Sequence, residues 1–246
     1  MAGQTAEYDY EAGSYDESRF SNKIGRHMDY MHKKIVQDLN ISGNLILDAG
    51  TGTGRFATWL AKKGFEVIGV DLSHKMLNVA KKKVKKLGLD ISLILADIHF
   101  LPFKSGVFDG VICVNVIDHL SAINEFLKNI ADVLKLEGYL IFNFSNILSP
   151  YLPIAIIVNS RKQALFKRGK IHSRWFTLRE INALTLRNGF SIKEIKGCFI
   201  ASPLPFGDNL VKIIQVINFS GEDSKLRLFS GSLFVKAQLI NRVANV

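Results

Sequence analysis

The feature that most constrains this chain is an alternation of short apolar runs with segments of helical periodicity between residues 44 and 144. The apolar runs occupy residues 44–49, 65–70, 91–96, 110–115 and 139–144. The segments 55–63, 73–87 and 121–134 read as helices, and 136–138 as a turn. Because strands joined by helices require right-handed crossovers, the pattern predicts a parallel sheet with helices on both faces.

The rest of the chain adds elements around this core. Upstream, five apolar residues share one face of an amphipathic helix: Ile24, Met28, Met31, Ile35 and Leu39. Downstream, helices are predicted at residues 177–188 and 209–219, and strands at 190–195 and 233–239. Additions to a core sheet of this kind usually shape a substrate pocket.

A glycine-rich segment, DAGTGTG at residues 48–54, follows the first predicted strand. Ligands of open α/β sheets bind at the carboxyl ends of the strands, and glycines there let the backbone approach a ligand closely. Asp71 ends the second strand, where its carboxylate can accept both hydrogen bonds of a ribose diol. Asp97 ends the third strand, where it can accept from an adenine amino group. Together these features predict a site for a nucleoside cofactor.

The glycine spacing discriminates between nucleotide cofactors. A dinucleotide fingerprint that began at Gly50 and Gly52 would need its third glycine at position 55, which is Arg55. The sequence also has no Gly-Lys-Ser/Thr loop of the triphosphate-binding type. The pattern therefore argues against NAD and against nucleoside triphosphates.

Four segments carry a resemblance to a known family: LDAGTGTGRF, GVDLSHKML, LADIHFLPFKSGVFDGVICVNVIDHL and VLKLEGYLIF. In this order they resemble the successive motifs of class I S-adenosylmethionine-dependent methyltransferases. The chain looks most like the small-molecule branch that includes the ubiquinone and menaquinone biosynthesis methyltransferases. The resemblance covers residues 44–145, and RWFTLREINALTLRNGF is similar to a helix that follows the fifth strand in that group. Such motifs specify the cofactor, S-adenosyl-L-methionine, far better than the methyl acceptor.

The resemblance also implies a fold and a division of the chain. We expect an α/β fold with a doubly wound, Rossmann-like sheet of seven strands, mostly parallel with an antiparallel last strand, and helical caps at the N-terminus and after strand five. The whole chain, 1–246, would be a single methyltransferase domain. Its parts would be N-terminal cap helices at 1–42, a cofactor-binding core at 43–145, a basic and apolar cap insert at 146–176, and the C-terminal part of the sheet at 177–246.

By position, the resemblance assigns eleven residues to the cofactor: Asp48, Gly50, Thr51, Gly52, Gly54, Asp71, Leu72, Met76, Asp97, Ile98 and Asn115. Asp48, Gly50 and the main chain of Asn115 would lie at the methionine end. The other two glycines would let the loop pass close to the cofactor. Thr51 departs from the most frequent form of this loop, which has Cys or Ser there.

The adenosine half of the cofactor would be held by the next two loops. The resemblance implies that Asp71 binds the ribose hydroxyls, with Leu72 and Met76 packing on the adenine. Asp97 would accept from the adenine amino group, and the Ile98 N–H would donate to a ring nitrogen.

Candidates for catalysis and acceptor binding are less specific. His119 follows the fourth strand and is the best candidate for a general base, although a histidine there could equally open or pack on the next helix. His172 is a second candidate in the basic insert. Tyr15 is expected to close over the cofactor, and Arg174 and Trp175 to contact the acceptor. No cluster of His, Cys or acidic residues has metal-ligand spacing, so we expect no metal.

Charge is the main guide to the acceptor. The chain has a formal net charge of +10, all of it from residues 148–246, which hold 15 Lys/Arg against 5 Asp/Glu. Residues 161–179 contain seven basic side chains and no acid. This field suits an anionic or lipid-like small molecule, an RNA or a membrane surface, and the alternative is a basic surface that only faces water. We expect residues 146–176 to cap the acceptor pocket.

Three functions remain open on the sequence. The first is methyl transfer to a small molecule, on oxygen or carbon. The second is RNA (tRNA) methylation, which the aromatic residues Phe166, Trp175 and Phe176 among the basic ones would suit as stacking surfaces. The third is a binding module without activity, which the intact glycine loop argues against. The chain lacks the Asn/Asp-Pro-Pro-aromatic run that resembles enzymes methylating adenine or cytosine amino groups.

Compartment follows from what the sequence lacks. It shows no apolar stretch of spanning length and no signal-peptide pattern at its start. Cys113 and Cys198 lie far apart in apolar surroundings, which is typical of buried thiols in a reducing environment. We therefore expect a cytoplasmic protein; the oligomeric state is not predicted.

Overall fold

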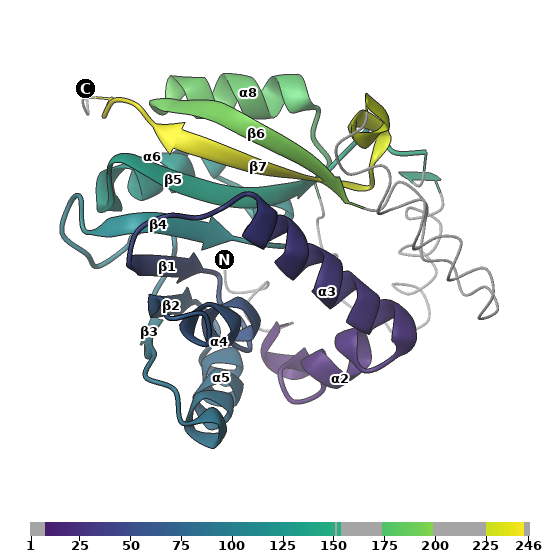
Figure 1. The fold of residues 1–246 in the computed structure, drawn as a ribbon, viewed down its shortest axis with the longest axis vertical. Helices are drawn as coiled ribbons and strands as arrows, with labels where there is room; N and C mark the ends of the chain where they lie inside the picture. The colour runs from purple at the N-terminus through teal and green to yellow at the C-terminus, as the bar shows by residue number, and fades with distance from the viewer. Residues whose placement is uncertain (1–7, 151, 154–173, 199–224, 244–246) are drawn as a thin grey trace.

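The computed structural model describes residues 8–150, 152–153, 174–198 and 225–243. Its centre is a seven-stranded sheet in the order β3-β2-β1-β4-β5-β7-β6 (Figure 1). The strands are β1 Leu45–Ala49, β2 Glu66–Asp71, β3 Ser92–Leu95, β4 Phe108–Cys113, β5 Leu134–Ser145, β6 Phe190–Cys198 and β7 Ser232–Leu239. Strands β1 to β5 pair in parallel, and β7 runs antiparallel between β5 and β6. The expected seven-stranded fold with an antiparallel last strand is confirmed.

Helices cover both faces of the sheet. They are α2 Tyr15–Phe20, α3 Lys23–Asp38, α4 Arg55–Ala61, α5 His74–Leu87, α6 Ile123–Val133 and α8 Leu178–Arg187, with short 3-10 turns η1 Ile117–His119 and η2 Lys225–Phe229. In Figure 1, α6 and α8 lie on one face and α3 on the other. The expected helix at 209–219 and most of the cap insert, 154–173, lie outside the described residues.

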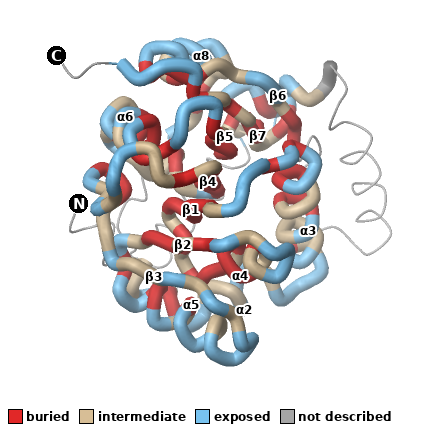
Figure 2. Tube along the Cα trace, turned by 60° about the vertical axis from the view of Figure 1, so that its left-hand side comes forward, coloured by how far each residue is buried: buried red, intermediate tan, exposed pale blue. Residues whose placement is uncertain are grey.

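Alternation along each central strand divides the core in two. In β1, Leu47 packs with α6 and α8, whereas its neighbour Ile46 packs with α3 and α4. In β4 the same division separates Val111 from Ile112. Figure 2 shows the buried residues gathered along the strands, between exposed outer helix surfaces. Because successive strand residues point to opposite faces, a continuous apolar strand is stable only when helices cover both faces.

Local signals explain where the helices begin. The Ser73 side chain caps α5 by accepting from the Met76 N–H at 3.1 Å. Thr177 and Glu180 form a reciprocal capping box at the start of α8. The expected boundary of α6 is shifted, because η1 occupies the turn after β4 and the helix begins at Ile123.

One expectation of local structure is wrong. Residues 136–138 do not separate a helix from β5 but lie within β5 itself. The pairing with β4 shifts there: Phe108 faces Leu134, whereas Gly110 faces Tyr139. The extra residues of β5 are accommodated as a bulge, with Glu137 at φ 64°, so both ends of the strand keep their hydrogen bonds to β4.

Two general expectations can be compared with the described residues. Cys113 and Cys198 are both buried thiols, as expected. Within the part of the chain that the structure describes, no helix is long and apolar enough to cross a membrane.

Candidate functional site

A pocket opens at the carboxyl ends of the central strands. Its lining includes ten of the eleven residues predicted for the cofactor, together with His119 and Tyr15. The loops after β1, β2, β3 and β4 all contribute, because parallel strands end at the same edge of the sheet. The fold therefore brings together residues that are 73 positions apart in the sequence, from Asp48 to Ser121.

The glycine loop turns sharply between β1 and α4. Gly50 has φ 78°, and its N–H and that of Thr51 both donate to the Val70 carbonyl of β2, at 2.8 and 2.9 Å. A Cβ at Gly50 would lie 2.5 Å from the Val116 side chain, so only glycine fits there. A Cβ at Gly52 would meet nothing within 4 Å, which leaves the loop backbone open to a ligand on that side.

Gly54 is the predicted cofactor residue that does not line the pocket. It is the N-cap of α4 in a left-handed conformation, at φ 74°. A Cβ there would lie 3.1 Å from the Ala80 side chain of α5. Position 54 therefore requires glycine because the start of α4 needs a left-handed backbone there and because α4 packs closely on α5.

Asp48, the penultimate residue of β1, is almost completely buried. Its Oδ2 accepts from the Thr51 hydroxyl at 2.6 Å and from the Ala57 N–H of α4 at 3.0 Å. Burial raises the pKa of this carboxyl to about 6, against the lowering effect of the Thr51 hydrogen bond. A cationic group entering the pocket would stabilise the charged form, so this position suits the ammonium end of an amino acid.

Asp71 joins the first two loops of the pocket. Its Oδ2 accepts from the Gly52 N–H at 2.8 Å, and its Oδ1 from the Ser73 N–H at 2.9 Å. Burial raises its pKa, while these backbone hydrogen bonds oppose the rise. Each carboxylate oxygen has a second acceptor site, so the group can still accept from a diol.

Asp97 has a hydrogen-bond partner, His99, that was not predicted from the sequence. Its Oδ1 accepts from the His99 N–H at 2.9 Å and lies 2.7 Å from His99 Nδ1. His99 is 6% exposed and also lines the pocket. With Oδ1 committed to His99, Oδ2 is the oxygen placed to accept from a ligand. The spacing Asp-x-His was the only available signal.

Asn115 follows β4 in a left-handed conformation, at φ 62°. Its N–H donates to Asn143 Oδ1 of β5 at 2.7 Å, and Asn143 Nδ2 donates back to Asn115 Oδ1 at 3.0 Å. Asn143 also donates to the Ser232 hydroxyl of β7 at 2.9 Å. This pair, in which Asn143 is buried and Asn115 is exposed, fixes the backbone course at the pocket edge.

His119 lies in η1 and lines the pocket next to the N-terminal segment. The ring of Tyr8 packs edge-on against it, with centroids 5.9 Å apart. Burial lowers the pKa of His119 to about 4, and the positive charge of Arg19 acts in the same direction. The imidazole is therefore neutral at pH 7 and able to accept a proton.

The neighbouring Asp118 anchors this turn. Its carboxylate accepts from the Ser145 N–H at 2.9 Å and from the Ser145 hydroxyl at 2.6 Å, which ties η1 to the end of β5. Its backbone carbonyl accepts from the Arg174 N–H at 2.9 Å. Arg174 and Trp175 do not line the pocket, and the Arg174 side chain lies over the Phe176 ring at 4.8 Å. His172 lies outside the described residues.

Sequence reasoning missed several residues of the lining. Besides His99, they include Tyr8, Thr53, Ser73 and Val116. Tyr8 carried a signal that could have been used, because it precedes an aspartate just as Tyr15 does. Among the described residues, no group of three or more His, Cys, Asp or Glu could hold a metal ion.

Comparison with known proteins places this geometry in a family. The family described as "Methyltransferase domain" matches residues 47–142. The ubiquinone biosynthesis O-methyltransferase of Rickettsia canadensis is 30% identical over 172 residues, which cover 69% of this chain and 72% of that protein.

Solved structures share the fold at lower identity. A SAM-dependent methyltransferase of Thermotoga maritima, described as a possible histamine N-methyltransferase, has a TM-score of 0.66 at 22% identity, over 95% of this chain and 98% of that chain. The magnesium protoporphyrin IX methyltransferase of Synechocystis, solved with bound SAH, has a TM-score of 0.62 at 22% identity, over 96% of this chain and 99% of that chain.

Proposed function

The chain belongs to the class I S-adenosylmethionine-dependent methyltransferases, and from this premise we propose that it methylates the oxygen or carbon of a small-molecule acceptor. The proposal rests mainly on one pocket. Three carboxylates from the carboxyl ends of neighbouring strands line it, those of Asp48, Asp71 and Asp97, and His119 lines it too. S-adenosylmethionine, when bound, supplies a methyl group on a sulfonium sulfur that is already activated for in-line displacement.

In this proposal each of the three carboxylates binds a different part of the cofactor. Asp48 and the Asn115 carbonyl hold the ammonium group of the methionine end, since the Asn115 N–H is already used by Asn143. Asp71 accepts from the ribose hydroxyls, and Asp97 Oδ2 from the adenine amino group. Leu72 and Met76, which line the pocket between these carboxylates, pack on the adenine.

In this proposal the acceptor occupies the part of the pocket next to His119. The lining also includes the aromatic rings of Tyr8 and Tyr15 and the apolar side chains of Val116 and Leu120. These side chains would hold the acceptor's oxygen or carbon in line with the methyl group that the bound cofactor would supply. His119 takes the proton that an acceptor hydroxyl or acidic carbon must lose. The surrounding side chains exclude water that would compete for the methyl group.

The relatives support a small acceptor. One is named for O-methylation in ubiquinone biosynthesis and another for magnesium protoporphyrin IX. An RNA acceptor is the second candidate, favoured by the basic residues 161–179, most of which lie outside the described residues. The aromatic lining around His119 suits an apolar ring better than a phosphate backbone, which places the small molecule first.

The first prediction concerns the cofactor. A saturating concentration of S-adenosylhomocysteine should raise the melting temperature by about 5–10 °C, because about 100 Kd of ligand adds about 2.7 kcal/mol to a domain of this size. NAD at the same concentration should have no effect. Thermal unfolding with each ligand measures both, and stabilisation by NAD alone would contradict the proposed cofactor site.

The second prediction concerns the acceptor. With cofactor labelled in its methyl group, we expect label to enter a component of a lipid extract or metabolite pool, and not total RNA. Each pool is incubated separately with the purified chain and fractionated by size. Label in RNA that declines steeply as salt rises would support the RNA candidate instead, because phosphate contacts release counterions.

A further inference from the structure

The N-terminal segment contains the same dipeptide twice. Tyr8-Asp9 and Tyr15-Asp16 lie seven residues apart. Both tyrosines line the pocket, although they come from a part of the chain well before the first strand. Both aspartates bond to loops of the pocket, as described next. In each copy of the dipeptide, the tyrosine lines the pocket and the aspartate hydrogen-bonds to a pocket loop.

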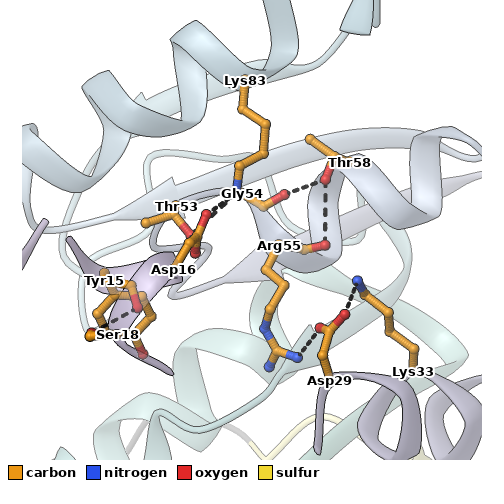
Figure 3. A network of polar contacts seen from close by, with 10 residues as sticks. All are labelled: Tyr15, Asp16, Ser18, Asp29, Lys33, Thr53, Gly54, Arg55, Thr58 and Lys83. Atoms are coloured by element: carbon orange, nitrogen blue, oxygen red, sulfur yellow. Dashed lines mark hydrogen bonds and ion pairs between the residues drawn. The ribbon is translucent and has the colours of Figure 1, made fainter. Parts of the chain in front are cut away.

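Asp16 attaches the segment to the glycine loop (Figure 3). Its Oδ1 accepts from the Thr53 hydroxyl at 2.6 Å, and its Oδ2 pairs with Lys83 Nζ of α5 at 2.6 Å. Lys83 Nζ also lies 3.5 Å from the Thr53 hydroxyl oxygen. Thr53 is 2% exposed, so its hydroxyl is removed from water and depends on this carboxylate.

Asp9 makes the matching contact with the second loop. Its Oδ1 accepts from the Ser73 hydroxyl at 2.5 Å. Ser73 is 2% exposed, and its N–H donates to Asp71, which in turn accepts from Gly52 in the glycine loop. The two N-terminal aspartates thus bond to opposite ends of one continuous network around the predicted ribose site.

Apolar packing of this segment is slight. Helix α2 has no buried residue, and within 8–20 Ala12 is the one buried apolar side chain. The next helix is different, because α3 buries Met31, Ile35 and Val36 against the sheet. Its attachment also includes Arg55, which pairs with Asp29 of α3 at 2.8 Å (Figure 3). Polar contacts at Asp9 and Asp16 therefore contribute a large share of what holds residues 8–20 in place.

We propose that Asp9 and Asp16 are positioning residues that hold Tyr8 and Tyr15 over the pocket. Through Ser73 and Thr53 they couple the order of residues 8–20 to the conformation of the cofactor loops. The proposal rests on the proposed function in that the ligand of these loops is S-adenosylmethionine. Binding of that ligand fixes the loops and so favours the closed segment, and the closed segment in turn slows release of the ligand.

The position of residues 8–20 also affects the surroundings of the His119 imidazole. Tyr8 packs on the imidazole, and the Arg19 guanidinium of α2 lies close enough to act on its charge. Arg19 is held by an ion pair with Glu11 at 3.1 Å and lies over the Tyr15 ring at 4.6 Å. Opening of residues 8–20 would therefore remove both the ring contact and the nearby positive charge from the proposed base.

The test compares Asp9→Ala, Asp16→Ala and the double variant with Asp38→Ala. Asp38 is a matched control, because it forms an ion pair with Lys34 within α3 and does not line the pocket. Calorimetry with S-adenosylhomocysteine should show about tenfold weaker binding for the double variant, since tenfold corresponds to about 1.4 kcal/mol. The Asp38→Ala variant should bind as the wild type does. Lys83→Ala, which leaves the pocket lining intact, should show a smaller loss.

Hydrogen exchange gives a readout that does not depend on turnover. In the wild type, S-adenosylhomocysteine should slow exchange in peptides covering residues 8–20, and in the double variant this protection should be lost. A double-mutant cycle of Asp16→Ala with Thr53→Val should show non-additive losses, because both changes remove the same hydrogen bond.

Failure of the two proposals would look different. If the wild type binds the ligand and the aspartate variants match it in affinity and in protection of residues 8–20, the positioning role is wrong while the proposed function stands. If the wild type does not bind S-adenosylhomocysteine, the proposed function is wrong. Unchanged exchange in residues 8–20 of the ligand-free variants would then also overturn the attachment by Asp9 and Asp16.

Discussion

Replacing Asp71 with alanine is expected to weaken S-adenosylmethionine binding by about 2–4 kcal/mol, roughly 30- to 1000-fold, because a carboxylate that accepts two hydroxyl hydrogen bonds is lost. The same carboxylate also receives the Gly52 and Ser73 N–H groups, so the two loops lose their common acceptor. Calorimetry of the variant against wild type measures the affinity.

Two controls separate ligand binding from folding. Asp71→Asn keeps the shape and one acceptor oxygen, so we expect an intermediate loss. Asp38→Ala removes a surface carboxylate of α3 and should leave affinity unchanged. Far-ultraviolet circular dichroism should show the same helix content in all three variants. A folded Asp71→Ala variant with wild-type affinity would refute the ribose role.

Replacing His119 with alanine should reduce kcat by about 10²–10⁴-fold if the acceptor carries a proton, which is the usual contribution of a general base. Cofactor affinity should change much less, because the assigned cofactor contacts, apart from the Asn115 carbonyl, come from the other loops. Single-turnover rates with the true acceptor measure the first quantity, and calorimetry the second.

The pH dependence provides a sharper signature of His119. Burial lowers the pKa of His119 to about 4, so its neutral form persists well below the usual histidine range. At saturating cofactor, whose ammonium group keeps Asp48 charged, the rate should therefore hold as pH falls from 7 towards 5 and decline only near 4, provided that the protein remains folded. The alanine variant should lack this decline. A wild-type decline centred near pH 6.5 would mean that His119 is exposed during the reaction, and an unchanged kcat in the variant would exclude the base role.

Much of the lining of the proposed cofactor pocket could be predicted from the sequence, because its signals are local. Asp48, Asp71 and Asp97 each follow an apolar strand, and parallel strands necessarily end at the same edge of the sheet. The glycine positions likewise reflect backbone constraints within one short loop. Even here the prediction was incomplete, since Gly54 packs on α5 and His99 occupies one oxygen of Asp97.

The sequence by itself determined the α/β class, the approximate strand positions and most of the segments that line the proposed cofactor pocket, because hydrophobic periodicity and glycine spacing are properties of neighbouring residues. Only the tertiary structure decided that Tyr8 reaches the pocket, that Asn115 pairs with Asn143, and that His119 is buried enough to stay neutral. These features depend on contacts between residues that are far apart in the chain. A local sequence pattern does not specify which distant side chain will bury a given group or form a hydrogen bond with it. These contacts follow from the packing of the whole sheet and its helices.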